Sequence, residues 1–437
     1  MHLYSCAACG QTLFFENNVC ERCGHELGFL ADTMSLLTLE RDGEVLQPLK
    51  GTGSYTYCGN ASLGVCNWLV PAPLAASGAL CVACRHNQTI PDLSVDENLQ
   101  GWRALEAAKH QLFYALLRLK LPLRDIAEDP AHGLAFDFMA DPPGPGPRIL
   151  TGHDEGLITI NLAEADDSVR EGLRAEMGEP YRTLLGHFRH EIGHYYWNEL
   201  VRDGDGLEGC RAVFGDDSRD YAEALQQHYE QGPPAGWEEN YVSAYATMHP
   251  WEDFAETWAH YLHIVDTLET ASAFGLRIHP RRRAQALLHA DINFDPYRAI
   301  TIETLIDAWL PLTFAMNALN RSMGHADMYP FVLSQPVIRK LGFIHELVHG
   351  RAMAAVPAGK RGLPGKHRKP GRTAAANQPP PSDPPAPPGP SPVKPPVEPP
   401  PEPGPDIRPP LEEPPQELPP PEIPPRPPAG DPPPLQA

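Results

Sequence analysis

The spacing of hydrophobic positions changes along the chain, and each spacing predicts a type of element. From Asn98 to about Leu121, apolar residues recur every three or four positions, which predicts an amphipathic helix. Two short strands are predicted at 134–139 and 157–161, separated by the turn-forming segment DPPGPGP at 141–147. From Ser168 to about Phe343 the pattern is mostly helical. The pattern therefore predicts an α+β fold in which helices predominate.

The C-terminal part of the chain follows no such pattern. Of 52 prolines, 30 lie between Pro379 and Ala437, after a basic, glycine-rich stretch at 360–372. Repeated prolines remove backbone donors and favour a solvated polyproline II chain. We therefore predict that residues 351–437 form a disordered tail. Such a tail is either a ligand for a proline-binding partner or, as we favour, a stiff spacer.

Composition narrows the classes of function. The formal net charge of −21 argues against a nucleic-acid-binding protein, because phosphate contacts need a basic surface. No apolar run reaches the length of about 18 residues that a transmembrane helix needs, and the start MHLYSCAACG does not resemble a signal peptide. We expect a cytoplasmic protein without membrane attachment, in which thiols stay reduced and paired cysteines bind metal.

Eight of the nine cysteines lie within the first 84 residues and form two sets. Two CxxC turns complete a tetrahedral Zn²⁺ site typical of a zinc ribbon, with the predicted ligands Cys6, Cys9, Cys20 and Cys23. A less regular set predicts a second structural zinc site with the ligands Cys58, Cys66, Cys81 and Cys84. His25 and His86 each follow a CxxC pair by two residues and are alternative ligands. Four disulfides in an exported protein are the other interpretation, and they lack an export signal.

The segment HEIGH at 190–194 carries the catalytic prediction. Residues four apart share one face of a helix, so His190 and His194 can reach one Zn²⁺ while Glu191 lies beside it. Such a zinc lowers the pKa of a bound water, and Glu191 is the predicted general base for attack on a peptide carbonyl. Apolar positions through the same stretch predict a helix packed in a core: Tyr181, Leu184, Leu185, Phe188, Ile192, Tyr195, Tyr196 and Leu200.

A second HExxH motif comprises His345, Glu346 and His349. Gly350 follows at once and predicts the end of a helix. No carboxylate comes after it before Asp383, so no third ligand is available downstream. We interpret this motif as the polar side of a terminal helix, without a catalytic role.

The first motif has a partner in HPWEDFAETWAHYLH at 249–263, where Pro250 predicts a helix start. Glu252 and Glu256 lie on one face of that helix. Glu252 is the predicted third zinc ligand, and Glu256 is predicted to orient a ligating histidine. Bulky neighbours favour burial of these charges: Trp251, Phe254, Trp258 and Leu262. Tyr245, seven residues before Glu252, is a candidate oxyanion donor, and Tyr241 is a weaker one.

Other residues leave alternatives open. Further histidines can compete with Glu252 for the metal, namely His187, His249, His260 and His263. Cys210 stands apart from the other cysteines. It is either a thiolate that switches the catalytic zinc or, as we favour, a buried structural thiol.

These motifs resemble a known family. From Met1 to about His349 the chain is similar to the bacterial zinc-binding metallopeptidases with an N-terminal zinc-ribbon domain, through GLITINLAEAD, RHEIGHYYW, FGDDSRDYAEALQQHY and SAYATMHPWEDFAETWAHYL. The peptidase part also resembles the gluzincins that include anthrax lethal factor and the Pro-Pro endopeptidases. This resemblance implies Glu252 as third ligand, Glu256 as its supporting carboxylate and Tyr245 as oxyanion donor. It does not supply a substrate.

The prediction is thus an α+β protein in three parts. Residues 1–97 form a zinc-ribbon module with one or two structural Zn²⁺ ions, residues 98–350 a zincin-like, mostly helical metallopeptidase domain with one catalytic Zn²⁺, and residues 351–437 the tail. The predicted function is hydrolysis of peptide bonds in a peptide or protein. The main alternative is a non-catalytic scaffold that binds a partner protein through its zinc ribbon. Zincins place an edge strand before the HEIGH helix, and the resemblance therefore implies that the strand at 157–161 lies at a sheet edge and binds an extended peptide by strand addition. The alternative is an ordinary half-buried strand.

Overall fold

The computed structural model describes residues 2–74, 78–142, 144, 148–170, 172, 183–281 and 288–350. All of them belong to one compact unit. The predicted tail at 351–437 and Tyr181 lie outside the described residues. No described helix is long and apolar enough to cross a bilayer.

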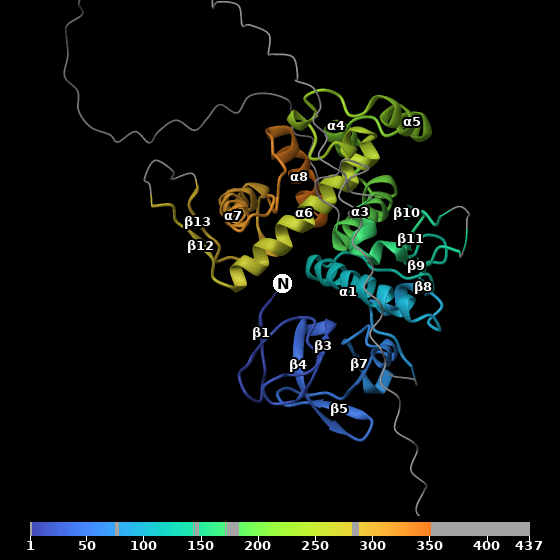
Figure 1. Ribbon diagram of the computed structural model, residues 1–437, viewed down its shortest axis with the longest axis vertical. Helices are drawn as coiled ribbons and strands as arrows, with labels where there is room; N and C mark the ends of the chain where they lie inside the picture. Colours follow the sequence, from blue (N-terminus) through green and yellow to red (C-terminus); the bar gives the residue numbers. More distant parts are fainter. Residues whose placement is uncertain are drawn as a thin grey trace, which may run out of the picture. The chain divides into compact units, whose positions relative to one another are not determined.

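The N-terminal part is built of β-strands (Figure 1). A hairpin of β1 (Tyr4–Ser5) and β2 (Thr12–Leu13) precedes an antiparallel sheet of five strands in sequential order. These strands are β3 (Glu26–Leu30), β4 (Ser35–Asp42), β5 (Val45–Pro48), β6 (Tyr55–Tyr57) and β7 (Leu69–Pro71). The two ends of the sheet meet, because Phe29 of β3 pairs with Trp68 just before β7. The sequence analysis did not predict this sheet.

A second sheet has four strands in the order β10, β11, β9, β8. These are β8 (Asn87–Thr89), β9 (Ala135–Met139), β10 (Gly152–Asp154) and β11 (Leu157–Asn161). β9 is parallel to both β8 and β11, whereas β10 runs antiparallel to β11. Both predicted strands are confirmed.

The prediction that the strand at 157–161 lies at a sheet edge is wrong. β10 pairs with its outer side, so that Gly152 lies opposite Thr159, and β9 pairs with its other side. A tight turn folds the chain back between β10 and β11. Gly156 has a φ of 98°, and a Cβ there would lie 2.6 Å from the carbonyl oxygen of His132, so the turn requires glycine.

Helices form most of the remaining described structure (Figure 1). They are α1 (Asp96–Leu119), α3 (Leu184–Trp197), α4 (Leu207–Phe214), α5 (Tyr221–Gln231), α6 (Pro250–Ala273), α7 (Ile302–Ser322) and α8 (Gln335–Val348). A small hairpin of β12 (Arg277–Ile278) and β13 (Ala290–Asp291) interrupts them. The helix predicted at 98–121 is α1, and the predicted helical region after Ser168 is largely confirmed.

The long helix α6 packs against α3 at very short range. Gly193 makes this possible, because a Cβ at that position would lie 3.0 Å from the Cα of Ala255 and 3.3 Å from the Cβ of Trp258. The close approach brings the first turns of α6 next to the histidines of α3.

One hydrophobic core runs from the N-terminal part into the helices. At its N-terminal end, the rings of Phe15, Phe29 and Trp68 pack together, with centroids 4.8 to 6.1 Å apart, and Tyr114 of α1 packs against Phe15 at 5.4 Å. The Tyr114 hydroxyl donates to Glu269 of α6 at 2.8 Å. Helix α1 therefore joins the N-terminal part to the helices that follow.

The second HExxH motif lies at the end of α8, as predicted, but the interpretation as a polar side is wrong. His345 is fully buried and its Nδ1 lies 3.1 Å from the hydroxyl of Tyr261. His349 bonds two backbone carbonyl oxygens. Neither belongs to a cluster of metal-ligand type among the described residues. His345 is therefore part of the buried interior of the fold.

A buried ion pair joins α8 to α6. The Lys340 ammonium lies 2.6 Å from a carboxylate oxygen of Asp253, donates to the carbonyl oxygen of Asn240 at 2.7 Å and sits 4.1 Å from the ring centroid of Tyr241. Asp253 is fully buried. The pair holds α8 beside the first turn of α6.

Lys340→Met is expected to destabilise the protein by about 3–5 kcal/mol, because it leaves the Asp253 carboxylate buried without its cation. Urea unfolding of both proteins measures the difference. The double variant Lys340→Met/Asp253→Asn removes both charges and should recover part of the loss. A loss of only about 0–1 kcal/mol, as for an exposed ion pair, would contradict the assignment.

Candidate active site

The HEIGH segment lies in α3, as predicted. Thr183 caps the helix by accepting a hydrogen bond from the amide of Gly186 at 3.0 Å. His190 and His194 are both buried, and their Nε2 atoms lie 3.1 Å apart. The i, i+4 spacing therefore places both imidazoles on one point, as expected.

The third predicted ligand comes from the start of α6. His249 caps this helix, accepting a hydrogen bond from the amide of Trp251 at 3.1 Å, and Pro250 follows it at the first helical position. In the same first turn, Oε2 of Glu252 lies 3.0 Å from Nε2 of His190 and 3.4 Å from Nε2 of His194. Three ligand atoms from two helices thus converge.

The hydrogen bonds around His190 show that these atoms fit a metal ion. Its Nδ1 lies 2.7 Å from Oε1 of Glu256, whose Oε2 accepts from the hydroxyl of Ser243 at 2.6 Å. A carboxylate accepts, so Nδ1 carries the proton and Nε2 turns its lone pair toward Glu252. Among the described residues, Oε2 of Glu252 is buried and accepts no hydrogen bond. Lone pairs facing one another suit a cation, and two imidazoles with one carboxylate suit Zn²⁺.

The pKa values of His190, Glu252 and Glu256 show that the cluster favours positive charge. Burial would lower the pKa of His190, but the adjacent carboxylates of Glu252 and Glu256 outweigh it and raise this pKa well above its usual value. Burial would raise the pKa of Glu252, but the two histidines hold that pKa below its usual range. The pKa of Glu256 is also lowered, despite burial, chiefly by its bond to the first histidine.

Glu191 is buried beside this cluster and does not belong to it. Burial would raise its pKa, but a hydrogen bond from His187 and the charges of the neighbouring histidines lower that pKa. The carboxylate is therefore in its basic form at neutral pH.

None of the four competing histidines joins the cluster. His187 bonds Glu164, and His249 is the helix cap. His260 bonds the hydroxyl of a tyrosine, and His263 accepts from an arginine. Each ring is used elsewhere in the fold, which leaves Glu252 as the third converging group.

Two phenols lie at the cluster, of which the sequence analysis identified one. The ring of Tyr245 lies 6.0 Å from that of His190, and burial raises its pKa well above the usual value, so its hydroxyl stays protonated. Tyr221 of α5 donates to Oε1 of Glu252 at 2.9 Å. Tyr221 lies within the motif FGDDSRDYAEALQQHY that carried the family resemblance, but no spacing rule linked it to Glu252. Tyr241 packs on a lysine instead.

Each set of four cysteines also gathers in space, with all ligand atoms within 4.8 Å of one another. In the first set, Sγ of Cys6 lies 3.5 Å from Cys23, and Cys9 lies 3.6 Å from Cys20. In the second, Cys66 lies 3.8 Å from Cys81. Zn–S bonds in a tetrahedron place sulfurs about 3.8 Å apart, whereas a disulfide needs about 2.0 Å. All nine cysteines are free, so the disulfide alternative is wrong.

The histidines near these sets differ from the alternatives considered. Nδ1 of His25 lies 3.3 Å from Sγ of Cys23, at the edge of the first set, whereas His86 bonds a backbone carbonyl. The second set instead meets His110 of α1, whose Nε2 lies 3.3 Å from Sγ of Cys66. The sequence analysis missed this contact, because the two residues are 44 positions apart. Helix α1 therefore contributes a histidine that packs directly against the second set of cysteines.

Cys210 belongs to neither set. It is buried in α4, and burial raises the pKa of its thiol to about 12. A protonated thiol of this kind suits a structural position better than a metal switch.

Comparisons with known proteins agree with the two kinds of site. Residues 98–347 match the model of a family described as "putative zinc-binding metallo-peptidase", which spans more than half of the chain. The chain belongs to this family. Residues 3–95 match a zinc-ribbon domain. The first match begins in α1 and ends in α8, so it includes the whole His190–His194–Glu252 cluster.

The chain is also similar to whole proteins from mycobacteria. Uncharacterized proteins from Mycobacterium bovis and from two strains of Mycobacterium tuberculosis are 44% identical over 362 residues, covering 83% of this chain and 99% of each relative. No solved structure matches the chain.

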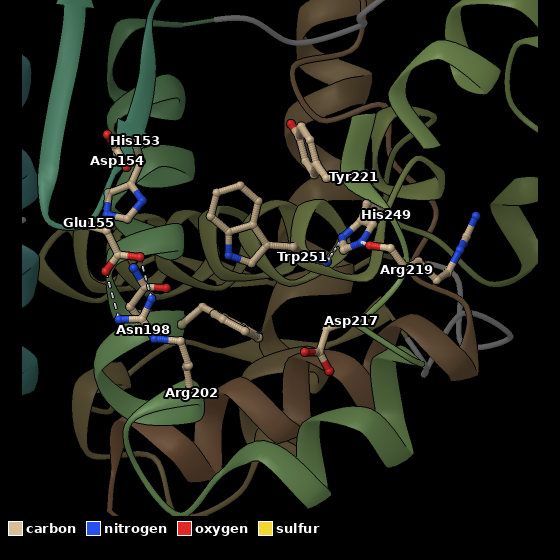
Figure 2. A pocket seen from close by; sticks show the side chains of 11 residues that line it. His153, Asp154, Glu155, Asn198, Arg202, Asp217, Arg219, Tyr221, His249 and Trp251 are labelled. Atoms are coloured by element: carbon tan, nitrogen blue, oxygen red, sulfur yellow. Dashed lines mark hydrogen bonds and ion pairs between the residues drawn. The ribbon is translucent and has the colours of Figure 1, made fainter. Parts of the chain in front are cut away.

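A cavity of about 300 Å³ lies next to Trp251 at the start of α6 (Figure 2). The ring of Trp251 packs on His194 with centroids 3.7 Å apart and forms part of the cavity wall. His153 of β10 lies on one side of this indole and Tyr221 on the other (Figure 2). The cavity thus adjoins both the indole that packs on His194 and the outer strand of the sheet.

Proposed function

We propose that this chain is a zinc-dependent peptidase, as the predicted roles of its residues imply. The observation that carries the proposal is the convergence of His190, His194 and Glu252. The buried carboxylate of Glu191 lies beside them and is not part of the cluster. A zinc ion held by these three residues would polarise the scissile carbonyl and lower the pKa of a water molecule.

The roles of the surrounding residues follow from their contacts. Glu191 takes a proton from the attacking water and passes it to the leaving amine. Glu256 holds His190 in the tautomer that offers Nε2, because its carboxylate accepts from Nδ1. Tyr245 donates to the oxyanion that forms from the carbonyl, since its hydroxyl stays protonated.

The substrate chain is proposed to lie along β10 rather than β11. β10 is the outer strand of its sheet among the described residues, and two of its residues, His153 and Asp154, line the cavity next to Trp251. An extended peptide added to this strand would pass Trp251 and the cluster. The side chain next to the scissile bond would then occupy the cavity.

Metal content tests the proposal directly. We expect three zinc ions per wild-type chain: one at His190, His194 and Glu252, and one at each cysteine set. His190→Ala should retain two and lose all cleavage of a mixed peptide library, because two ligands hold the ion weakly. His279→Ala is the control, since His279 is exposed and bonds Asp291 in a hairpin away from the cluster. It should retain three zinc ions and full turnover.

The alternative outcomes separate the two candidate functions. If zinc is present but the wild type cleaves no peptide, the proposed peptidase activity is wrong and a zinc-binding scaffold becomes the better description. If His190→Ala loses no zinc, the three residues do not form a metal site.

A further inference from the structure

A series of polar contacts links Glu164, which follows the sheet, through His187 to Glu191. His187 lies one helical turn before Glu191 on α3, and its Nε2 lies 3.3 Å from Oε1 of that carboxylate. Its Nδ1 lies 2.5 Å from Oε2 of Glu164. His187 thus stands between two buried or nearly buried carboxylates and outside the metal cluster.

Glu164 is also held by residues outside α3. It lies in a short 3₁₀ helix, Leu162–Ala165, which directly follows β11 and is capped by the side chain of Asn161. The hydroxyl of Thr151 donates to Oε1 of Glu164 at 2.5 Å, and Arg170 donates to its backbone carbonyl. Glu164 is therefore held in place by hydrogen bonds that do not involve His187.

The hydrogen-bond inventory determines the protons on His187. Ionised carboxylates only accept, so a ring bonded to two of them must donate from both nitrogens. The local charges agree with this. Both carboxylates are buried, and each of them faces one ring nitrogen of His187.

We infer that Glu164 and His187 form a positioning pair that holds the carboxylate of Glu191 in one orientation. The inference rests on the proposed peptidase function. With Oε1 occupied by the imidazole, Oε2 of Glu191 is the oxygen that remains to take the proton. In each turnover this proton passes from water to Oε2 and from there to the leaving amine, while His187 keeps both of its protons.

The pair is expected to affect turnover and not metal binding. His187→Gln can donate from one atom only, so the bridge is broken without removing a buried polar group. We expect kcat to fall by about 10- to 100-fold, as for other residues that orient a catalytic group, with KM and zinc content unchanged. Glu164→Gln should lower kcat less, because an amide oxygen still accepts from Nδ1.

A double variant distinguishes a linked pair from two separate structural roles. If Glu164 acts through His187, the double variant Glu164→Gln/His187→Gln should lose no more kcat than His187→Gln alone. Additive losses, or equal falls in kcat and zinc content, would overturn the inference. His279→Gln is the matched control, since it breaks a histidine–carboxylate pair of the same kind in an exposed hairpin, and it should leave kcat unchanged.

A readout that needs no turnover tests the bridge itself. In ¹⁵N-histidine-labelled protein, His187 should show two ring N–H signals, which disappear in His187→Gln, and one of them should shift in Glu164→Gln. A single N–H signal would overturn the bridge. If His187→Gln turns over substrate as fast as the wild type does, the positioning role is wrong, but the proposed function is not. Absence of turnover in the wild type would overturn the proposed function, and the positioning role with it.

Discussion

Glu191→Gln is expected to lower kcat by about 10²- to 10⁴-fold, which is the usual contribution of a general base. The amide has nearly the shape of the carboxylate but cannot take a proton from water. Because Glu191 lies beside the three converging ligands and is not one of them, the variant should keep its full zinc content. Peptide-library turnover and metal analysis on the same preparation measure both quantities.

The same substitution at an exposed site provides the control. Glu208 lies on the exposed face of α4, and Glu208→Gln should change neither turnover nor zinc content. Loss of zinc in Glu191→Gln would mean that Glu191 is a metal ligand. Unchanged turnover with zinc retained would mean that another group takes the proton.

Local periodicity was sufficient for the helices that carry the site. Two imidazoles four residues apart must share a helix face, and a proline before an acidic, apolar-flanked stretch predicts the start of α6. The positions of His190, His194, Glu252 and Glu256 therefore follow from spacing. Their convergence also needs the close approach of α3 and α6, which Gly193 makes possible.

Contacts between distant segments account for what the sequence analysis missed or got wrong. Whether a strand is an edge depends on which segment pairs with it, so β10 was not foreseen beside β11. His345 matched a metal motif, yet the packing of α8 on α6 buries it. Tyr221 and His110 reach their sites from other helices. No spacing rule links such residues.

The second cysteine set should matter to the entire fold and not only to the N-terminal part. Sγ of Cys66 meets His110 of α1, and the ring of Trp68 packs 5.1 Å from that imidazole. α1 in turn packs against α3, which carries HEIGH. Disruption of this cysteine set is therefore expected to propagate to the candidate active site.

Cys81→Ser is expected to remove one zinc ion and to destabilise the protein severely. Structural zinc contributes about 10–16 kcal/mol in zinc-finger peptides, whereas whole domains are stable by only about 5–15 kcal/mol. The midpoint of thermal unfolding should fall steeply, and peptide turnover should fall with it. Calorimetry and metal analysis measure the two effects.

Cys210→Ser is the matched control, because it makes the same change at a buried cysteine outside both sets. It should cost about 1–3 kcal/mol, the penalty for burying an unpaired hydroxyl, and retain all three zinc ions. If Cys81→Ser keeps its full zinc content, four cysteines are not the ligands of the second site. Co²⁺ spectra would then show whether nitrogen has replaced sulfur, and His110 is the imidazole close enough to supply it. In that case the zinc itself would bind the N-terminal part to α1.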